Sequence, residues 1–269
     1  MERHEMIEDS FLGPAAPDLG WVPAPRYLMR RARILRQLDK LKPGRLLEVG
    51  PGAGMLLIEA ARRGFQCTGL EPSAAARSLA ETVIARSGQN IPIHGEAGAH
   101  WNNAFDTLFS FDVLEHIDRD REALLQWHDW LVPNGTLLLS VPAHMQMWTA
   151  GDEWAGHFRR YERDPLLQLL RETGFTPECH ECYGFPLTNF SERMSARTYA
   201  KRILRDSSSE ENRQRNNDRS GIDRGPHLKI YPLLSSAPGK LALRTFLGIQ
   251  QWFVRSDMGS GYLVKARRT

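Results

Sequence analysis

The stretch Leu46-Leu47-Glu48-Val49-Gly50-Pro51-Gly52-Ala53-Gly54 determines how the rest of the chain is interpreted. A short apolar run ends in three glycines at alternate positions, and a helical pattern of apolar residues follows from Met55. This order predicts a β-strand, a glycine turn and the start of a helix. Glycine adopts positive φ angles and lets a ligand approach the backbone closely. The N–H groups and positive dipole of the helix start favour the polar, partly anionic end of a nucleotide-like ligand.

Two carboxylates distinguish between the possible ligands. The dinucleotide fingerprint G-x-G-x-x-G would need a glycine at position 55, where this chain has Met55. Glu48 precedes the first glycine closely, where it would repel a pyrophosphate and could pair with an ammonium group. Glu71 ends the next apolar run, and an acid there can accept both hydroxyls of a ribose. An amino-acid end, a ribose and no phosphate together describe S-adenosylmethionine (SAM).

With these residues the chain resembles the class I SAM-dependent methyltransferases. Glu48–Gly54 is similar to their first motif, and Leu70-Glu71-Pro72 is similar to their second. In that family an acid after the third strand hydrogen-bonds the adenine amino group, and Glu96 resembles it. The segment 111–117 resembles the Asp/Glu-x-Leu-Glu-His element of small-molecule methyltransferases, including those of ubiquinone biosynthesis. The implied cofactor-binding residues are Glu48, Gly50, Gly52, Gly54, Glu71, Pro72, Glu96, Ala97, Ser110 and Phe111.

The alternation of apolar runs and helical patterns predicts an α/β fold. We expect a doubly wound, Rossmann-like sheet whose ligands bind at the carboxyl ends of the strands. The family resemblance implies seven strands, six parallel and the last antiparallel, with a helical substrate lobe inserted before the last one. The expected strands are 45–49, 66–71, 91–95, 105–110, 136–141, 176–183 and 260–266, and the main helices are 26–41, 54–63, 73–87, 119–130, 165–173, 187–204 and 240–254.

Four segments follow from this reading of the chain. Residues 1–25 contain several prolines and predict an irregular arm over the active site, because their apolar side chains need a surface to cover. Residues 26–183 form the SAM-binding domain. Residues 184–256 form the helical substrate or lid segment, in which the polar stretch 206–225 is expected to be mobile. Residues 257–269 supply the final strand.

The connection after the fifth strand is rich in aromatic and ionisable residues and is expected to form part of the site. The candidate catalytic residues are His157, His116 and Tyr161, since histidine titrates in the useful pH range. Trp148, Arg159 and Tyr27 are the candidate substrate-binding residues, with Tyr27 or Arg31 placed near the SAM carboxylate. Either histidine could instead be structural. Tyr161 and Trp148 could simply close the core, and Arg159 could form a surface ion pair.

Composition limits the remaining possibilities. The chain has 269 residues, of which 41% are hydrophobic and 25% are charged, so a packed core is expected. It contains no long apolar run and no visible signal peptide, and its three cysteines fit a reducing cytoplasm. Cys179 and Cys182 lie in one predicted strand, where they would face opposite sides, and no second ligand pair has a matching spacing. We therefore predict no metal site.

The sequence supports one function best, which is transfer of a methyl group from SAM to an O or N atom of a small-molecule acceptor. A nucleic-acid methyltransferase is disfavoured because Pro-Pro is absent after the fourth strand and no cysteine follows a proline. RNA remains a weaker possibility as the acceptor. A non-methylating cyclisation or rearrangement on the same fold would use the same cofactor motifs, as would SAM binding without catalysis. Both a monomer and a homodimer fit the sequence.

Overall fold

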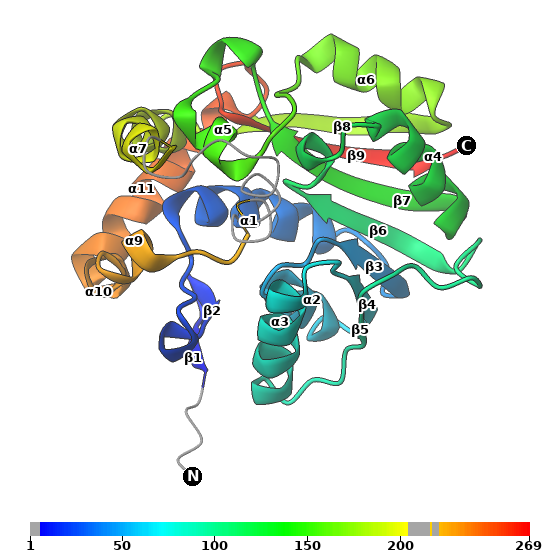
Figure 1. Cartoon of the computed structure of the whole chain (residues 1–269), viewed down its shortest axis with the longest axis horizontal. Helices are drawn as coiled ribbons and strands as arrows, with labels where there is room; N and C mark the ends of the chain where they lie inside the picture. The colour runs from blue at the N-terminus through cyan, green and yellow to red at the C-terminus, as the bar shows by residue number, and fades with distance from the viewer. Residues whose placement is uncertain (1–5, 204–215, 217–220) are drawn as a thin grey trace.

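A computed structural model describes residues 6–203, 216 and 221–269 of the chain. Its centre is a seven-stranded sheet with the order β5-β4-β3-β6-β7-β9-β8 (Figure 1). The strands are β3 (Arg45–Val49), β4 (Gln66–Leu70), β5 (Ile93–His94), β6 (Phe105–Phe111), β7 (Leu131–Pro142), β8 (Phe175–Tyr183) and β9 (Gly261–Arg268). Only β9 runs against its neighbours β7 and β8. The predicted α/β fold, with a single antiparallel strand inserted near one edge, is confirmed.

Helices cover both faces of this sheet. Neighbouring residues of a strand point to opposite sides, so the strands place apolar side chains on both faces and the helices bury them. The covering helices are α1 (Pro25–Leu38), α2 (Met55–Ala61), α3 (Ala74–Arg86), α4 (Asp120–Trp130) and α6 (Arg163–Glu172). Leu46 belongs to the apolar cluster beneath α1, α2 and α3, whereas Leu47 belongs to the cluster beneath α4 and α6. Leu138 and Leu139 of β7 divide between the clusters in the same way. The central strands are therefore buried on both faces.

The strand register brings the quoted motifs to one edge of the sheet. Val49, the last residue of β3, pairs with Leu70 of β4 on one side and with Ser110 of β6 on the other. The glycine turn, Glu71 and the segment after β6 consequently leave the sheet side by side. This edge is where parallel α/β sheets bind ligands.

Three predicted boundaries differ from the structure for local reasons. β7 already starts at Leu131, and the register shift before Thr136 accommodates the predicted turn, in which Asn134 has φ +62°. Helix α6 starts at Arg163 rather than Pro165, with Glu162 as its N-cap, because proline is tolerated within a first helical turn. β5 is shorter than expected, as is common at a sheet edge.

The N-terminal arm is more regular than expected. β1 (Ile7–Asp9) and β2 (Gly13–Ala15) form a hairpin, and the 3-10 turn η1 (Pro17–Leu19) follows. The Asp9 carboxylate accepts the N–H groups of Phe11 and Leu12 and so shapes the hairpin turn. Leu12 is fully buried, so the arm contributes to the main core.

The segment before β9 is helical, as predicted. It contains α7 (Leu187–Ile203), α9 (Gly225–Leu228), α10 (Tyr231–Ser235) and α11 (Ala237–Phe253). Figure 1 shows these helices gathered beyond the carboxyl ends of β6 and β7. Most of the stretch 206–225 lies outside the described residues. Among the helices that are described, none is both long and apolar enough to cross a membrane.

Candidate active site

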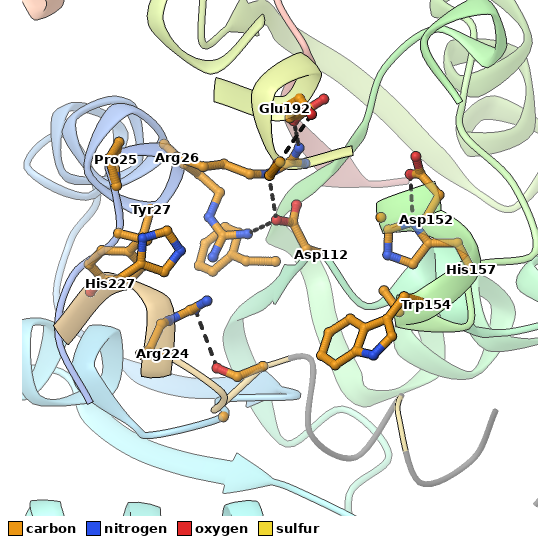
Figure 2. Close-up of a pocket in the computed structure, with 18 of the residues that line it drawn as sticks. Pro25, Arg26, Tyr27, Asp112, Asp152, Trp154, His157, Glu192, Arg224 and His227 are labelled. Atoms are coloured by element: carbon orange, nitrogen blue, oxygen red, sulfur yellow. Dashed lines mark hydrogen bonds and ion pairs between the residues drawn. The ribbon is translucent and has the colours of Figure 1, made fainter. Parts of the chain in front are cut away.

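A cavity of about 470 Å³ opens at the carboxyl ends of β3 and β6. Its described walls come from α1, the glycine turn, the segment after β6, α5 (Ala150–Ala155), α7 and residues 221–230. Figure 2 shows Tyr27 and His227 on one side, Trp154 and His157 on the other, and Asp112 between them. The cavity thus lies between the sheet domain and the inserted helices.

The three glycines of the turn have different surroundings. All three have positive φ angles. A Cβ on Gly50 would overlap Val113, and one on Gly54, the N-cap of α2, would lie 3.2 Å from Ile84. A Cβ on Gly52 would meet nothing closer than the Gly221 carbonyl at 3.6 Å, because Gly52 faces the cavity. Gly50 and Gly52 line the cavity, whereas Gly54 allows α2 and α3 to pack closely.

Glu71 fixes the shape of this turn. One of its oxygens accepts the Gly52 N–H at 3.0 Å, and the other accepts the Ser73 N–H at 3.1 Å. A carboxylate oxygen can accept more than one hydrogen bond. The predicted role of Glu71 in ribose binding fits this position and stays a prediction. Pro72, Glu96 and Ala97 are exposed at the same edge, beyond β4 and β5, and their cofactor contacts also stay predictions.

Glu48 and Tyr27 offer unpaired polar atoms to the cavity. Glu48 is only 2% exposed, and its Oε2 has no hydrogen-bond partner among the described residues. Burial raises the pKa of Glu48 to about 8, with Arg30 opposing the shift and Glu71 adding to it. The hydroxyl of Tyr27 is likewise buried without a partner within the described chain. An acid and a phenol placed in this way suit the ammonium and carboxylate groups of an amino acid.

Two arginines of α1 hold Asp112 in the centre of the cavity. Asp112 has φ +55°, and its carboxylate pairs with Arg30 and, at 3.5 Å, with Arg26. Ser140 donates a further hydrogen bond of 3.1 Å. Burial alone would raise the pKa of Asp112, but the two guanidinium groups bring it well below its usual range. Asp112 is therefore an anion with fixed partners.

A second carboxylate, Asp152 of α5, orients the predicted catalytic histidine. Its Oδ1 lies 2.9 Å from His157 Nδ1 (Figure 2). Arg160 binds both oxygens of Asp152 at 2.8 Å. Burial would raise the pKa of Asp152, but the hydrogen bonds from His157 and Arg160 lower it below its usual range. Arg160 also reaches Glu192 of α7 at 3.2 Å. When an anionic carboxylate accepts a hydrogen bond from Nδ1–H, the neutral ring carries its lone pair on Nε2.

Glu115, His116 and His157 meet at the cavity wall. The rings of His116 and His157 are edge to face, with centroids 4.6 Å apart. Glu115 is fully buried, and burial together with the negative charge of Asp112 raises its pKa. One possible ligand atom from each of the three residues lies within 4.8 Å of the others, a spacing that could hold a metal ion. The same spacing suits proton transfer to or from a bound hydroxyl group.

Five other predicted site residues have surroundings that differ from the expectation or add to it. Tyr161 is buried in the α4–α6 cluster and donates to Asp120 at 2.9 Å, so the geometry gives no support to a catalytic role. Arg159 pairs with Asp120 at 2.6 Å at the start of α4. Trp148 is not among the described residues that line the cavity, and its ring centroid lies 6.5 Å from that of His157. Ser110 is buried within β6, whereas the neighbouring Phe111 lines the cavity.

Sequence reasoning missed the charged residues that α1 and α7 contribute. Arg26 and Arg30 are four residues apart, so they share one face of α1, and that spacing was the signal that could have found them. Arg31 instead pairs with Glu59 at 2.6 Å and is not among the described residues that line the cavity. Nothing local in the sequence identifies Glu192, which meets Arg26 only after α7 has folded back onto α1.

Comparisons with known proteins agree with this fold and its cofactor motifs. A family model described as a methyltransferase domain matches residues 24–180, more than half of the chain. The ubiquinone biosynthesis O-methyltransferase of Cereibacter sphaeroides is 26% identical over 169 residues, which cover 57% of this chain and 68% of that protein. The mitochondrial ubiquinone biosynthesis O-methyltransferase of Schizosaccharomyces pombe is 29% identical over 113 residues. Those residues cover 40% of this chain and only 41% of the yeast protein.

Solved structures show the same fold at low sequence identity. Phosphoethanolamine N-methyltransferase 2 of Haemonchus contortus, solved with SAM, has a TM-score of 0.52 and 18% identity, covering 89% of this chain and 52% of that one. The [4+2]-cyclase SpnF has a TM-score of 0.54 and 20% identity, covering 90% of this chain and 82% of that one. Likeness at this level of identity establishes the fold alone.

The strand order, the Gly-x-Gly-x-Gly turn and the acids at Glu48 and Glu71 define a class I methyltransferase that uses SAM as its cofactor. The unpaired oxygen of Glu48, the phenol of Tyr27 and the open face of Gly52 fit this cofactor. The chain belongs to the methyltransferase family whose model it matches.

Proposed function

We propose that this enzyme methylates a hydroxyl group of a small molecule and that His157 is its general base. The observation that carries the proposal is the Asp152–His157 pair, whose 2.9 Å contact directs one ring nitrogen to the carboxylate. A hydroxyl group needs to lose its proton during methyl transfer, and a positioned histidine typically contributes about 10²–10⁴-fold to such a step. His116 and Glu115 lie beside His157 and complete the polar wall.

Bound SAM supplies an electrophilic methyl group on a sulfonium centre, which is already a good leaving group. The protein therefore has to hold the acceptor oxygen in line and near contact. We assign Glu48 and Tyr27 to the amino-acid end of SAM, Gly50 and Gly52 to close backbone approach, and Glu71 to the ribose. The cluster around His157 then receives the acceptor hydroxyl and takes up its proton.

Aromatic side chains favour a flat acceptor. Trp154 and Tyr199 line the cavity with ring centroids 5.1 Å apart, and the Arg202 guanidinium lies 5.4 Å from the Trp154 ring centre. Such a wall packs well against an aromatic ring. The curated relatives are named as ubiquinone biosynthesis O-methyltransferases, which agrees with a phenolic acceptor.

The charges of the cavity disfavour a nucleic acid. Its described walls contain five carboxyl groups and five arginines, so their formal charges balance: Glu48, Asp112, Glu115, Asp152 and Glu192 face Arg26, Arg30, Arg160, Arg202 and Arg224. Nucleic-acid sites instead gather positive charge against the phosphates.

We also place the enzyme in the cytoplasm, because Cys67, Cys179 and Cys182 are all free thiols.

A labelled-methyl assay tests the proposal. The full chain is incubated with methyl-labelled SAM and a panel of phenols, catechols and amines, and the products are identified by mass spectrometry. We expect label on oxygen, and we expect His157→Asn to lower kcat by about 10²–10⁴-fold while changing the dissociation constant of SAM little. His100→Asn, an exposed histidine of the 95–104 loop, is the matched control.

Three outcomes would contradict the proposal. The first is label found only on amines. The second is an isomerised product with the label retained on SAM, as in cyclisation. The third is a parallel loss of kcat and SAM affinity in His157→Asn, which would give His157 a structural role.

A further inference from the structure

A second cluster of possible metal ligands lies outside the active-site cavity. His144 follows β7, Cys182 is the penultimate residue of β8, and Asp257 belongs to the turn between α11 and β9. One ligand atom from each lies within 4.8 Å of the other two. The cavity lining contains none of the three, as far as the described chain shows. These residues are far apart in the sequence, so only the fold brings them together.

His144 is held in an unusual backbone conformation that aims its ring at the cluster. Its φ of +62° is rare for a residue with a side chain, and such strain concentrates at functional positions. The side chain is more than nine-tenths buried. Nε2 has no hydrogen-bond partner among the residues described and points towards Asp257 Oδ1 at 3.9 Å. A buried ring nitrogen in this state is ready to accept a proton or a metal ion.

The other ring nitrogen of His144 has the partners that a metal-binding histidine needs. Nδ1 lies 3.4 Å from the Glu162 carboxylate and 3.5 Å from the Tyr262 hydroxyl. A carboxylate behind Nδ1 selects the tautomer whose lone pair is on Nε2, and this arrangement recurs behind zinc-binding histidines. Glu162 therefore orients His144 towards Cys182 and Asp257.

Cys182 and Asp257 are supported in the same way. The Cys182 sulfur is almost fully buried and accepts the Gly259 N–H at 3.1 Å, a contact that would stabilise a thiolate. The Asp257 carboxylate accepts the Tyr262 hydroxyl at 2.7 Å and stays partly exposed, so an ion can reach the site from solvent. Each of the three candidate ligands thus has its own hydrogen-bond support.

We propose that His144 Nε2, Cys182 Sγ and Asp257 form a zinc site that is separate from the active site. Thiolate, imidazole and carboxylate are the ligands that zinc uses in proteins, and hard cations such as Mg²⁺ avoid thiolates. Three protein ligands leave a fourth position for water. Zinc binding would displace the proton of the Cys182 thiol. This proton can leave to solvent on the side of the site where Asp257 is exposed.

The site would fasten the turn between α11 and β9 to the ends of two other strands. Hydrogen bonds already connect these segments, from Cys182 N to Val254 O at 2.8 Å and from Ser260 N to Tyr183 O at 2.9 Å. An ion shared by β7, β8 and this turn would fix the point where the helical segment returns to the sheet. We infer a stabilising role that does not depend on the methyl acceptor.

Cobalt binding to the full chain tests the site. The protein is treated with a chelator, dialysed and titrated with Co²⁺, which replaces zinc and gives a near-ultraviolet absorption band when a thiolate binds it. We expect one equivalent with this band. Cys182→Ser should abolish the band, and Cys179→Ser should retain it because Cys179 faces the other side of β8, towards Gln37. Adding Zn²⁺ should displace the cobalt, and the zinc-loaded protein should have a higher Tm than the metal-free protein.

Asp257→Asn provides a second variant in case Cys182→Ser impairs folding. The Asp257 side chain is partly exposed, so this change should leave the fold intact. We expect its affinity for Co²⁺ to fall at least tenfold. The proposal would be overturned if the chain bound no Co²⁺, or if the band survived in Cys182→Ser. It would equally be overturned if His157→Asn removed the ion, since the ion would then belong to the Glu115–His116–His157 cluster.

Discussion

At Glu48, burial and function act in opposite directions. The carboxyl group has a pKa near 4.5 when exposed to water and about 8 in the folded protein without SAM, because burial disfavours its charged form. Between these two pH values the folded state binds more protons than the unfolded state. The free energy of unfolding consequently falls as the pH rises through this range. Pairing with the amino group of SAM, the role proposed for Glu48, would in contrast need the ionised form.

We therefore expect Glu48→Gln to make the SAM-free protein more stable and its SAM binding weaker. The gain in unfolding free energy should be small at pH 5 and reach a few kcal/mol at pH 8, since each unit of pKa shift is worth about 1.4 kcal/mol. Urea unfolding at pH 5, 6.5 and 8, together with calorimetry of SAM binding, measures both effects. Glu96→Gln, at an exposed position, is the control for stability. Parallel pH profiles for Glu48→Gln and the parent protein would contradict the assignment.

At Gly52, a substitution should affect ligand binding more than the packing of the protein. Gly52→Ala should weaken SAM binding at least tenfold, because the new methyl group enters the cavity and the positive φ of this residue adds strain. The strain itself costs about 1–2 kcal/mol of stability. Gly88→Ala has the same kind of strain at φ +72° with open space around it, so it should lose stability and keep its SAM affinity. Calorimetry and thermal unfolding of the two variants compare these effects, and equal SAM affinities would refute the role of Gly52.

At the scale of elements, one carboxylate connects α7 to the rest of the site. Glu192 pairs with Arg26 of α1 and with Arg160, which in turn holds Asp152. Glu192, Arg160 and Asp152 therefore join α7 to His157, the proposed general base. Arg160 is buried and Arg26 is partly buried, and a buried charge that loses its partner is costly.

We expect Glu192→Gln to loosen α7 and to lower the free energy of unfolding by about 1–3 kcal/mol, the cost of stranding charged hydrogen-bond partners. Hydrogen exchange should become faster in the backbone amides of 187–203 and remain unchanged in β3 and β6. The KM for the acceptor should rise more than the KM for SAM. Glu153→Gln, an exposed glutamate of α5, should change none of these quantities. Unaltered exchange in α7 would show that the ion pairs do not hold this helix.

The same elements show which parts of the structure are readable from sequence. The run 46–54 encodes strand, turn and helix locally, through apolar alternation and glycine positions, and so could be predicted closely. The bulge at 132–135 was less accessible, because it depends on how β7 pairs with β6. The spacing of Arg26 and Arg30 places them on one helix face but does not identify Asp112 as their partner, and nothing local identifies the partners of Glu192. Arg26 and Glu192 are separated by 166 positions and meet only through the folding of α7 onto α1.

At the scale of the whole molecule, the N-terminal arm joins the inserted helices to the sheet domain. Asp9 of the hairpin lies 2.5 Å from Lys240 of α11, and Arg244 of the same helix lies 4.9 Å above the Phe11 ring. Leu12 enters the large apolar cluster that also contains residues of α1, α2 and α11. Contacts of this kind indicate that the arm, the inserted helices and the sheet domain unfold together.

Leu12→Ala tests this cooperativity. Leu12 has no exposed surface, so removing its buried methyl groups should lower the free energy of unfolding by about 2–5 kcal/mol. Ile7→Ala in the same hairpin should cost far less, because the Ile7 side chain is 46% exposed. Urea unfolding followed by both tryptophan fluorescence and circular dichroism measures the two variants. A single, shifted transition in Leu12→Ala is expected from both probes. An early transition limited to fluorescence would instead show that the arm unfolds independently, with Trp21, and that the sheet domain is stable without it.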